Sequence, residues 1–264
     1  MIETAQNRRI RVVVLGGGPV LEQGVKRFIY QLEEHPEIEF LGAYCQSEGQ
    51  SIPAILRDLF RRRGFLAIPL FLLNQWSSAY RYLANQRQVK ILDRRMHQLS
   101  SRIHFVPNIH AKEVLDEVRK LGPDLGLIYS SPILKPDLFE IPGFGSLGIH
   151  HGKAPKYRGK KTTFWEIYNG EAAAGVIIQK INAGLDTGDI VKQGEVPIGT
   201  RSLGAVWKDL EQLGIELFIQ AIIEVKEGKV SYRPQVGQKG KLYRDPDFRQ
   251  ILTLWFRQFK RRVL

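Results

Sequence analysis

The strongest constraint on the fold is the alternation of short apolar runs with helical patterns along much of the chain. Apolar runs of strand length lie at Ile10–Leu15, Glu39–Cys45, His104–Pro107, Leu125–Tyr129 and Gly145–Ile149. Apolar residues at helical spacing lie between some of them, as in Val20–Glu34 and Lys112–Leu121. Runs that are apolar throughout are typical of strands buried on both faces, and alternation of strand with helix is typical of α/β domains. The pattern predicts a Rossmann-like, doubly wound and mostly parallel sheet.

Two later apolar runs predict an antiparallel pair that closes the sheet. They are Gly175–Ile181 and Ile190–Pro197, and the polar stretch Gly184–Asp189 separates them. A polar, glycine-bounded turn between two apolar strands favours antiparallel pairing. A long amphipathic helix, Leu203–Val225, follows the pair.

The chain has 264 residues, which is enough for a large α/β domain with an appendage. We interpret residues 1–200 as the α/β core and residues 201–264 as a C-terminal helix with a basic tail. Residues 51–99 interrupt the alternation with basic and apolar stretches. They contain Pro53 and Pro69, so they predict a helical insertion made of more than one helix.

The positive net charge of the chain favours anionic partners. The alternative is a soluble basic protein that has no such partner. The formal net charge is +12, which favours phosphorylated substrates, nucleic acid or an acidic membrane surface. Residues 53–97 hold nine Lys/Arg against two Asp/Glu around the apolar run Phe65–Leu73. The tail carries an apolar stripe followed by basic residues: Ile251, Leu252, Trp255, Phe256 and Phe259. Each segment either packs on the body or lies on an anionic membrane.

Several classes of protein are excluded by what the sequence lacks. No apolar stretch reaches the 18 to 20 residues of a membrane span, and the first residues do not read as a signal peptide. Cys45 is the single cysteine, so no intramolecular disulfide can form, and its apolar surroundings predict a buried, inert thiol. We expect a cytoplasmic protein, with peripheral membrane association left open.

Candidate chemistry gathers in the stretch Gly145–Gly159 and in the turn that contains Asp186 and Asp189. His150 and His151 follow a predicted strand, and a histidine there can act as general acid or base near neutral pH. A neighbouring carboxylate would fix its tautomer. Adjacent histidines on a strand point to opposite faces, and the sequence has no second metal-ligand cluster. We therefore expect no metal site.

The motifs in these stretches resemble the formyltransferase family that uses 10-formyltetrahydrofolate. That family has an Asn-x-His strand end, a loop ending in Pro-x-Tyr-Arg-Gly and a later Leu-Asp-x-Gly turn; here the loop ends in Pro155–Gly159 and the turn is Leu185–Gly188. The resemblance extends over about Ile10–Thr200 and identifies His150 and Asp186 as the catalytic pair. It implies that His150 stabilises an oxyanion or transfers a proton, and that Asp186 orients and charges it.

The same resemblance implies the binding residues. Ser131, Ile133, Leu134, Ile181 and Asn182 are expected to bind the folate co-substrate, and Tyr157, Arg158 and Gly159 are expected to form a substrate loop.

The sequence departs from the family pattern at Gly148, where the family has its asparagine. Glycine carries no side-chain donor, and loss of one such donor commonly costs about 10²–10³ in rate. Three interpretations remain open. A neighbour such as His151, Lys153 or Ser131 replaces the donor; the enzyme transfers a different one-carbon or acyl group; or the chain keeps the fold without transfer activity.

The expected function is an N-formyltransferase acting on a small amine, with a nucleotide-linked amino sugar as the favoured acceptor. Phosphates on such an acceptor would suit the basic surface. Aminoacyl-tRNA is the alternative acceptor, and the short segment after Thr200 disfavours it. A catalytically inactive protein that binds a folate, a nucleotide or an anionic surface is the alternative from a different class.

Overall fold

The computed structural model describes residues 8–18, 21–47, 86–235 and 240–263. Most of the predicted helical insertion, including the apolar run 65–73, lies outside the described residues. The insertion ends in a described helix, α4 (Gln86–Gln98).

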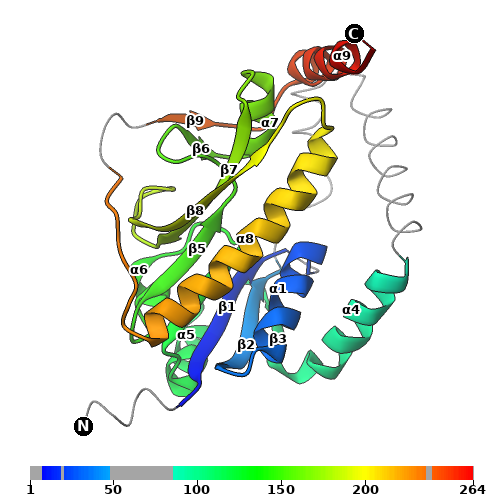
Figure 1. Cartoon of the computed structure of the whole chain (residues 1–264). Coiled ribbons are helices and arrows are strands. Elements are labelled where there is room, and N and C mark those ends of the chain that lie inside the picture. The colour runs from blue at the N-terminus through cyan, green and yellow to red at the C-terminus, as the bar shows by residue number, and fades with distance from the viewer. Residues whose placement is uncertain (1–7, 19–20, 48–85, 236–239, 264) are drawn as a thin grey trace.

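A seven-stranded sheet forms the centre of the molecule (Figure 1). Its strands are β1 (Ile10–Gly17), β2 (Ile38–Gln46), β3 (Ile103–Val106), β4 (Leu125–Tyr129), β5 (Ser146–His150), β7 (Ala173–Lys180) and β8 (Ile190–Pro197). The strand order is β3-β2-β1-β4-β5-β7-β8. Strands β1 to β5 pair in parallel, whereas β7 runs antiparallel to both β5 and β8. The prediction of a doubly wound, mostly parallel sheet with an antiparallel pair is confirmed.

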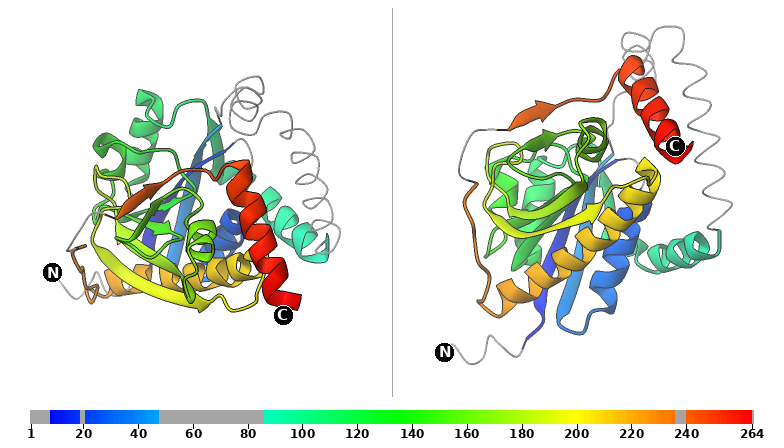
Figure 2. Two further views of the ribbon diagram at one scale, coloured as in Figure 1. Left: turned by 90° about the horizontal axis from the view of Figure 1, so that it is seen from above. Right: turned by 45° about the horizontal axis from the view of Figure 1, so that its top comes forward.

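Helices cover both faces of this sheet (Figures 1 and 2). On one face lie α1 (Gln23–Glu34) and α8 (Leu203–Lys226), with α4 packed against α1. On the other face lie α5 (Lys112–Leu121) and the short α6 (Pro136–Phe139). Burial of apolar side chains between helix and sheet is the main force that holds these layers together.

The sequence explains where these helices lie and where they end. The buried face of α1 repeats at helical spacing, and the ring of its Phe28 stacks on Phe218 of α8 with centroids 4.8 Å apart. The Ser202 hydroxyl caps α8 by accepting a hydrogen bond from the Ala205 N–H at 3.2 Å. Helix α5 ends where Gly122 adopts the left-handed conformation that favours glycine.

A second, two-stranded sheet brings the C-terminal segment back to the core. Strand β6 (Tyr157–Gly159) pairs in parallel with β9 (Lys241–Tyr243), and α9 (Phe248–Val263) follows. Helix α7 (Thr162–Tyr168) packs beside them, and Leu254 of α9 is buried in the same cluster. The sequence did not predict this pairing because both strands have only three residues and no alternating pattern.

Candidate functional site

A pocket of about 600 Å³ lies over β4, β5 and β7. All five residues predicted to bind folate line it: Ser131, Ile133, Leu134, Ile181 and Asn182. Gly148, Gly159 and Asp186 line the same pocket. The pocket therefore brings together three segments of the chain: 131–134, 148–159 and 181–186. In the sequence, only the resemblance to the family had linked them.

His150 and Asp186 face each other beside this pocket. The His150 Nδ1 atom lies 3.4 Å from Asp186 Oδ1, and both side chains are largely buried. The other ring nitrogen, Nε2, lies 2.9 Å from the Tyr157 carbonyl oxygen. Because a carbonyl oxygen only accepts, Nε2 must carry a proton and donate it. Both ring nitrogens of His150 therefore face protein acceptors.

Asp186 reaches His150 because the turn between β7 and β8 folds back over the sheet. Asp186 itself has φ +51°, a left-handed conformation that is uncommon outside glycine but tolerated by aspartate. Its Oδ2 accepts a hydrogen bond from the Gly159 N–H at 2.8 Å, and its Oδ1 lies 3.5 Å from Gln179 Nε2. Held backbone strain of this kind is typical of functional positions.

Each residue of the predicted substrate loop holds part of this arrangement. The Tyr157 carbonyl binds the His150 ring, the Gly159 N–H binds Asp186, and the Arg158 guanidinium donates from Nε to the Leu185 carbonyl at 3.0 Å. Gly159 has φ +93°, and a Cβ there would lie 2.4 Å from the Tyr243 carbonyl oxygen. Only glycine fits that close approach. We infer that the loop positions the His150–Asp186 pair, and Gly159 also borders the pocket.

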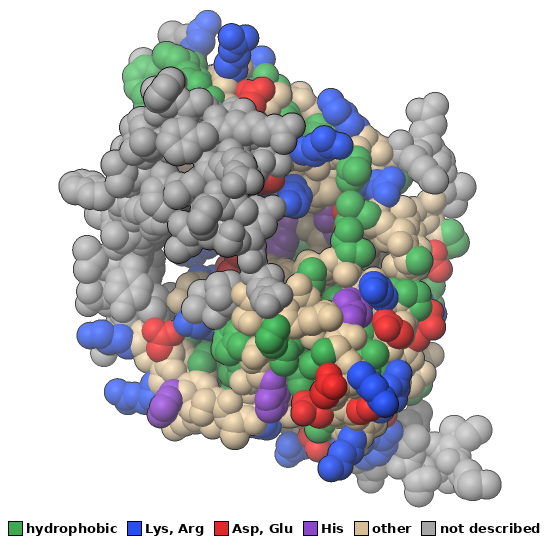
Figure 3. Space-filling view, turned by 180° about the vertical axis from the view of Figure 1, so that it is seen from behind, with side chains coloured by type: hydrophobic (Ala, Val, Ile, Leu, Met, Phe, Trp, Pro, Cys, Tyr) green, Lys and Arg blue, Asp and Glu red, His purple; other side chains and the backbone are tan. Residues whose placement is uncertain are grey.

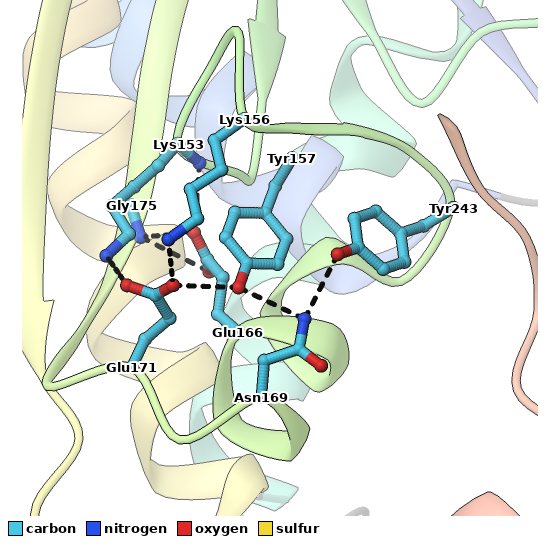
Figure 4. Close-up of polar contacts among 8 residues, drawn as sticks. All are labelled: Lys153, Lys156, Tyr157, Glu166, Asn169, Glu171, Gly175 and Tyr243. Atoms are coloured by element: carbon cyan, nitrogen blue, oxygen red, sulfur yellow. Dashed lines mark hydrogen bonds and ion pairs between the residues drawn. The ribbon is translucent and has the colours of Figure 1, made fainter. Parts of the chain in front are cut away.

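Two glutamates anchor the chain just before this loop (Figure 4). Glu166 is fully buried and accepts from the N–H groups of Lys153 and Gly175 at 2.9 and 3.2 Å. Burial raises the pKa of Glu166 to about 7, against the opposing effect of those hydrogen bonds. Glu171 accepts from Lys153 Nζ at 2.7 Å and from the Tyr157 hydroxyl at 2.8 Å. Hydrogen bonds from Lys153 and Lys156 lower the pKa of Glu171 to about 2.

Two residues considered as replacements for the missing asparagine do not lie at the pocket. The Lys153 ammonium is paired with Glu171. His151 points to the opposite face of the sheet, where its ring centroid lies 4.6 Å from that of Trp207. Burial lowers the pKa of His151 to about 3, so the ring is neutral near pH 7. The third, Ser131, does line the pocket, and its hydroxyl donates to the Pro132 carbonyl at 2.9 Å.

Ile181 fills the space above Gly148. A Cβ atom at Gly148 would lie 2.6 Å from Ile181 Cδ1, which is too close for real atoms. The nearest other atom is Ile128 Cβ, at 3.6 Å. The branched side chain of Ile181 therefore occupies the space that a side chain at position 148 would need.

Two lysines contribute positive charge to the pocket. Figure 3 looks onto the side opposite α8, which is hollowed near its centre and carries lysine and arginine side chains interspersed with acidic ones. Lys160 and Lys180 line the pocket, and 75% of the Lys160 side chain is exposed. Such an edge favours an anionic ligand. Within the described ranges, no group of three or more His, Cys, Asp or Glu side chains is arranged to hold a metal ion.

Sequence reasoning missed Gln179 and Gln235. Gln179 lies on β7, lines the pocket and is 4% exposed. A signal was present, because Gln179 is a polar residue inside the apolar run Gly175–Ile181. Gln235 donates to the Gln179 Oε1 atom at 3.2 Å, and nothing in the basic tail marked it for that position.

The middle of the chain matches known proteins. Residues 79–222 match the family model described as formyl transferase. Among curated relatives, the methionyl-tRNA formyltransferase of Ruminiclostridium cellulolyticum is 31% identical over 129 residues, which are 48% of this chain and 41% of the relative. The chain thus spans about two fifths of the length of the curated relatives it matches.

Solved structures share the fold at low sequence identity. A 4-N formyltransferase from Francisella tularensis has a TM-score of 0.58 and 14% identity, covering 93% of this chain and 86% of that one. Phosphoribosylglycinamide formyltransferase from Bacillus halodurans has a TM-score of 0.55 and 14% identity, covering 81% of this chain and 94% of that one. The resemblance that the motifs indicated is confirmed at the level of family and fold.

Proposed function

The chain belongs to the formyl transferase family, and from that premise we propose that it moves a formyl group from 10-formyltetrahydrofolate to a small amine. The observation that carries this proposal is the His150–Asp186 pair, held at 3.4 Å beside a pocket that the predicted folate-binding residues line.

The pocket has the properties that a folate would require. Its volume of about 600 Å³ lies within the range of ~300–1,000 Å³ common for ligand sites. Apolar side chains from Ile133, Leu134 and Ile181 supply contact surface for a flat ring system. Exposed lysine at its edge, Lys160, suits the carboxylates of a folate tail.

In the proposed reaction the amine nitrogen bonds to the formyl carbon, and the carbonyl π electrons move onto the oxygen. As the bond from that carbon to N10 breaks, N10 keeps the electron pair and gains a proton, while the amine nitrogen loses one. Asp186 lines the pocket, and the His150 ring lies next to the Asp186 carboxylate. We assign to this pair the proton transfer that the exchange requires.

A nucleotide-linked amino sugar is the acceptor that we propose. Lys160 and Lys180 in the pocket lining favour a substrate that carries phosphates. Aminoacyl-tRNA is the competing acceptor, since the curated relatives act on methionyl-tRNA by name. The segment that these relatives share with this chain is less than half of their own length.

Incubation with 10-formyltetrahydrofolate and a panel of amines tests the proposal. The panel contains nucleotide-linked amino sugars, free amino sugars and aminoacyl-tRNA, and mass spectrometry identifies any formylated product. The proposal expects folate turnover that depends on the amine, with the nucleotide-linked sugars as the best acceptors. Turnover restricted to aminoacyl-tRNA would contradict the proposed acceptor, and absence of any turnover would contradict the proposed activity.

Gly148 supports a second candidate function, a binding protein without transfer activity. The site lacks the side chain that the family places there, and Ile181 occupies its space. This candidate expects tetrahydrofolate to raise the melting temperature while no amine is formylated.

Helix α9 supports peripheral binding to an anionic membrane as an additional property. Its aromatic side chains Trp255, Phe256 and Phe259 are about 60% exposed, and its sequence holds five basic residues and no acidic one. Exposed aromatic and basic side chains on one amphipathic helix suit an interfacial orientation. None of the described helices is long and apolar enough to span a bilayer.

Vesicle sedimentation tests this property. We expect binding to vesicles that contain phosphatidylserine, weaker binding at high salt, and loss of binding when Trp255 and Phe259 are both changed to Ser. Equal binding to neutral vesicles, or full binding by that double variant, would contradict it.

A further inference from the structure

Gln179 lies directly opposite Gly148 in the sheet. The antiparallel pairing of β5 with β7 aligns these two residues, so their side-chain directions point to the same face. Both residues line the pocket. The family position that has lost its amide in this chain is therefore adjacent to a residue that carries one.

None of the other donors expected from the sequence is free to bind an oxyanion. The Ser131 hydroxyl lines the pocket but donates to the Pro132 carbonyl at 2.9 Å. The two ring nitrogens of His150 face the Tyr157 carbonyl oxygen and Asp186. Gly148 offers no side chain, and Ile181 covers it with carbon atoms. An oxyanion at this part of the pocket needs a donor from another residue.

The amide of Gln179 is held in one orientation. Gln235 Nε2 donates to the Gln179 Oε1 atom at 3.2 Å and to the Gly188 carbonyl at 2.7 Å, so Oε1 is the accepting end of the Gln179 amide. Nε2 is then the end that faces Asp186, at 3.5 Å. Its second hydrogen has no hydrogen-bond partner among the described residues. A buried N–H without a partner favours a ligand that accepts it.

We propose that Gln179 replaces the missing asparagine as the oxyanion donor of this site. Its Nε2–H donates to the formyl oxygen as the amine nitrogen attacks and the carbonyl π electrons move onto that oxygen. The hydrogen bond weakens again when the carbon–N10 bond breaks and the carbonyl re-forms. Gln179 loses no proton in any of these reaction steps. The inference rests on the proposed function and names one further catalytic residue for it.

The test uses Gln179→Met, which keeps the length of the side chain and removes the donor. We expect kcat to fall by about 10²–10³ with little change in KM, because the bond strengthens only in the transition state. The affinity for tetrahydrofolate, measured by calorimetry, should not change, since that molecule has no formyl oxygen. Gln193→Met is the matched control, because Gln193 lies on the neighbouring strand β8 and pairs with Arg233.

A rescue variant separates donation from a purely structural role. Adding Gly148→Asn to Gln179→Met returns an amide from the opposite strand, and Ile181→Val removes the methyl group that would obstruct it. We expect kcat of this triple variant to be at least tenfold higher than kcat of Gln179→Met. A structural role for Gln179 would show instead as a lower melting temperature in Gln179→Met and no rescue.

The outcomes distinguish this inference from the proposed function. An active wild type with an equally active Gln179→Met variant would overturn the role of Gln179 and leave the proposed function standing. A wild type that turns over no 10-formyltetrahydrofolate would overturn both. Loss of activity that is accompanied by weaker tetrahydrofolate binding and is not rescued would also overturn the donor role.

Discussion

His150 and Asp186 are 36 residues apart in the sequence, yet His150 Nδ1 and Asp186 Oδ1 lie 3.4 Å apart. One short strand, β6, holds both of them: the Tyr157 carbonyl accepts from the histidine, and the Gly159 N–H donates to the aspartate. Strand β6 is itself paired with β9 from the C-terminal segment. The geometry of the pair therefore depends on chain that follows α8, and not on the α/β core alone.

Gly159→Ala should disturb the pair through the backbone. The new Cβ would meet the Tyr243 carbonyl oxygen at 2.4 Å and would also require a left-handed backbone. We expect a loss of stability above the ~1–3 kcal/mol of the backbone strain alone, with a fall in kcat. Gly170→Ala is the control, because Gly170 also has positive φ but nothing lies within 4 Å of its added Cβ. Equal melting temperatures for the two variants would contradict the close approach.

Gly148→Asn should fit this site only with a change at Ile181. The added Cβ would lie 2.6 Å from Ile181 Cδ1, and overpacking of this kind costs roughly 1–3 kcal/mol. Ile181→Val removes that carbon, so the double variant Gly148→Asn with Ile181→Val should recover most of the lost stability. Urea unfolding of the two single variants and the double variant measures this coupling. Strictly additive effects would show that Ile181 does not fill the space above Gly148.

Glu166 should make stability depend on pH. Its folded-state pKa is raised to about 7 from the usual 4.5, so the folded protein binds the proton more tightly than the unfolded chain. Its contribution is therefore fully present below pH 4.5 and is lost as the pH rises to about 7, on the order of 3 kcal/mol in all. Glu166→Gln keeps an acceptor for the Lys153 and Gly175 N–H groups. We expect this variant to lose less stability than the wild type between pH 5 and pH 8.

His151→Leu should relieve acid sensitivity without affecting turnover. The folded-state pKa of His151 is lowered to about 3, and its Nε2 atom has no hydrogen-bond partner among the described residues. The unfolded chain takes up the proton near pH 6.5, so this histidine lowers the stability as the pH falls from there. Thermal unfolding at pH 5 and pH 7.5 should show a smaller difference for the variant. A large fall in kcat would mean that His151 acts in the reaction despite facing away from the pocket.

The sheet was predictable from the sequence because strands buried on both faces, such as β1 and β4, leave continuous apolar runs. The antiparallel pair was predictable for a different reason, because the polar Gly184–Asp189 turn marks the connection between its two strands. The juxtaposition of His150 with Asp186 came from the family motifs, because no local pattern fixes how a turn folds back over a sheet.

Three features of the site depend on tertiary contacts that no local pattern encodes. The β6–β9 pairing joins two segments of three residues each. Gln179 reaches the pocket only through its register with Gly148, and a one-residue slip would turn it to the other face. Ile181 covers Gly148 because it follows Gln179, the partner of Gly148, by two residues and therefore faces the same side of the sheet.

The most direct measurement compares two histidine–aspartate pairs that have the same separation. His110 Nδ1 and Asp137 Oδ1 also lie 3.4 Å apart, but neither residue lines the pocket. Turnover of 10-formyltetrahydrofolate with the best amine is measured for His150→Ala, Asp186→Asn, His110→Ala and Asp137→Asn, with folding checked by circular dichroism. We predict that the first two variants lose at least about 10² in kcat and that the last two turn over at the wild-type rate. Normal turnover by folded His150→Ala and Asp186→Asn would contradict the assignment of this pair as the catalytic centre.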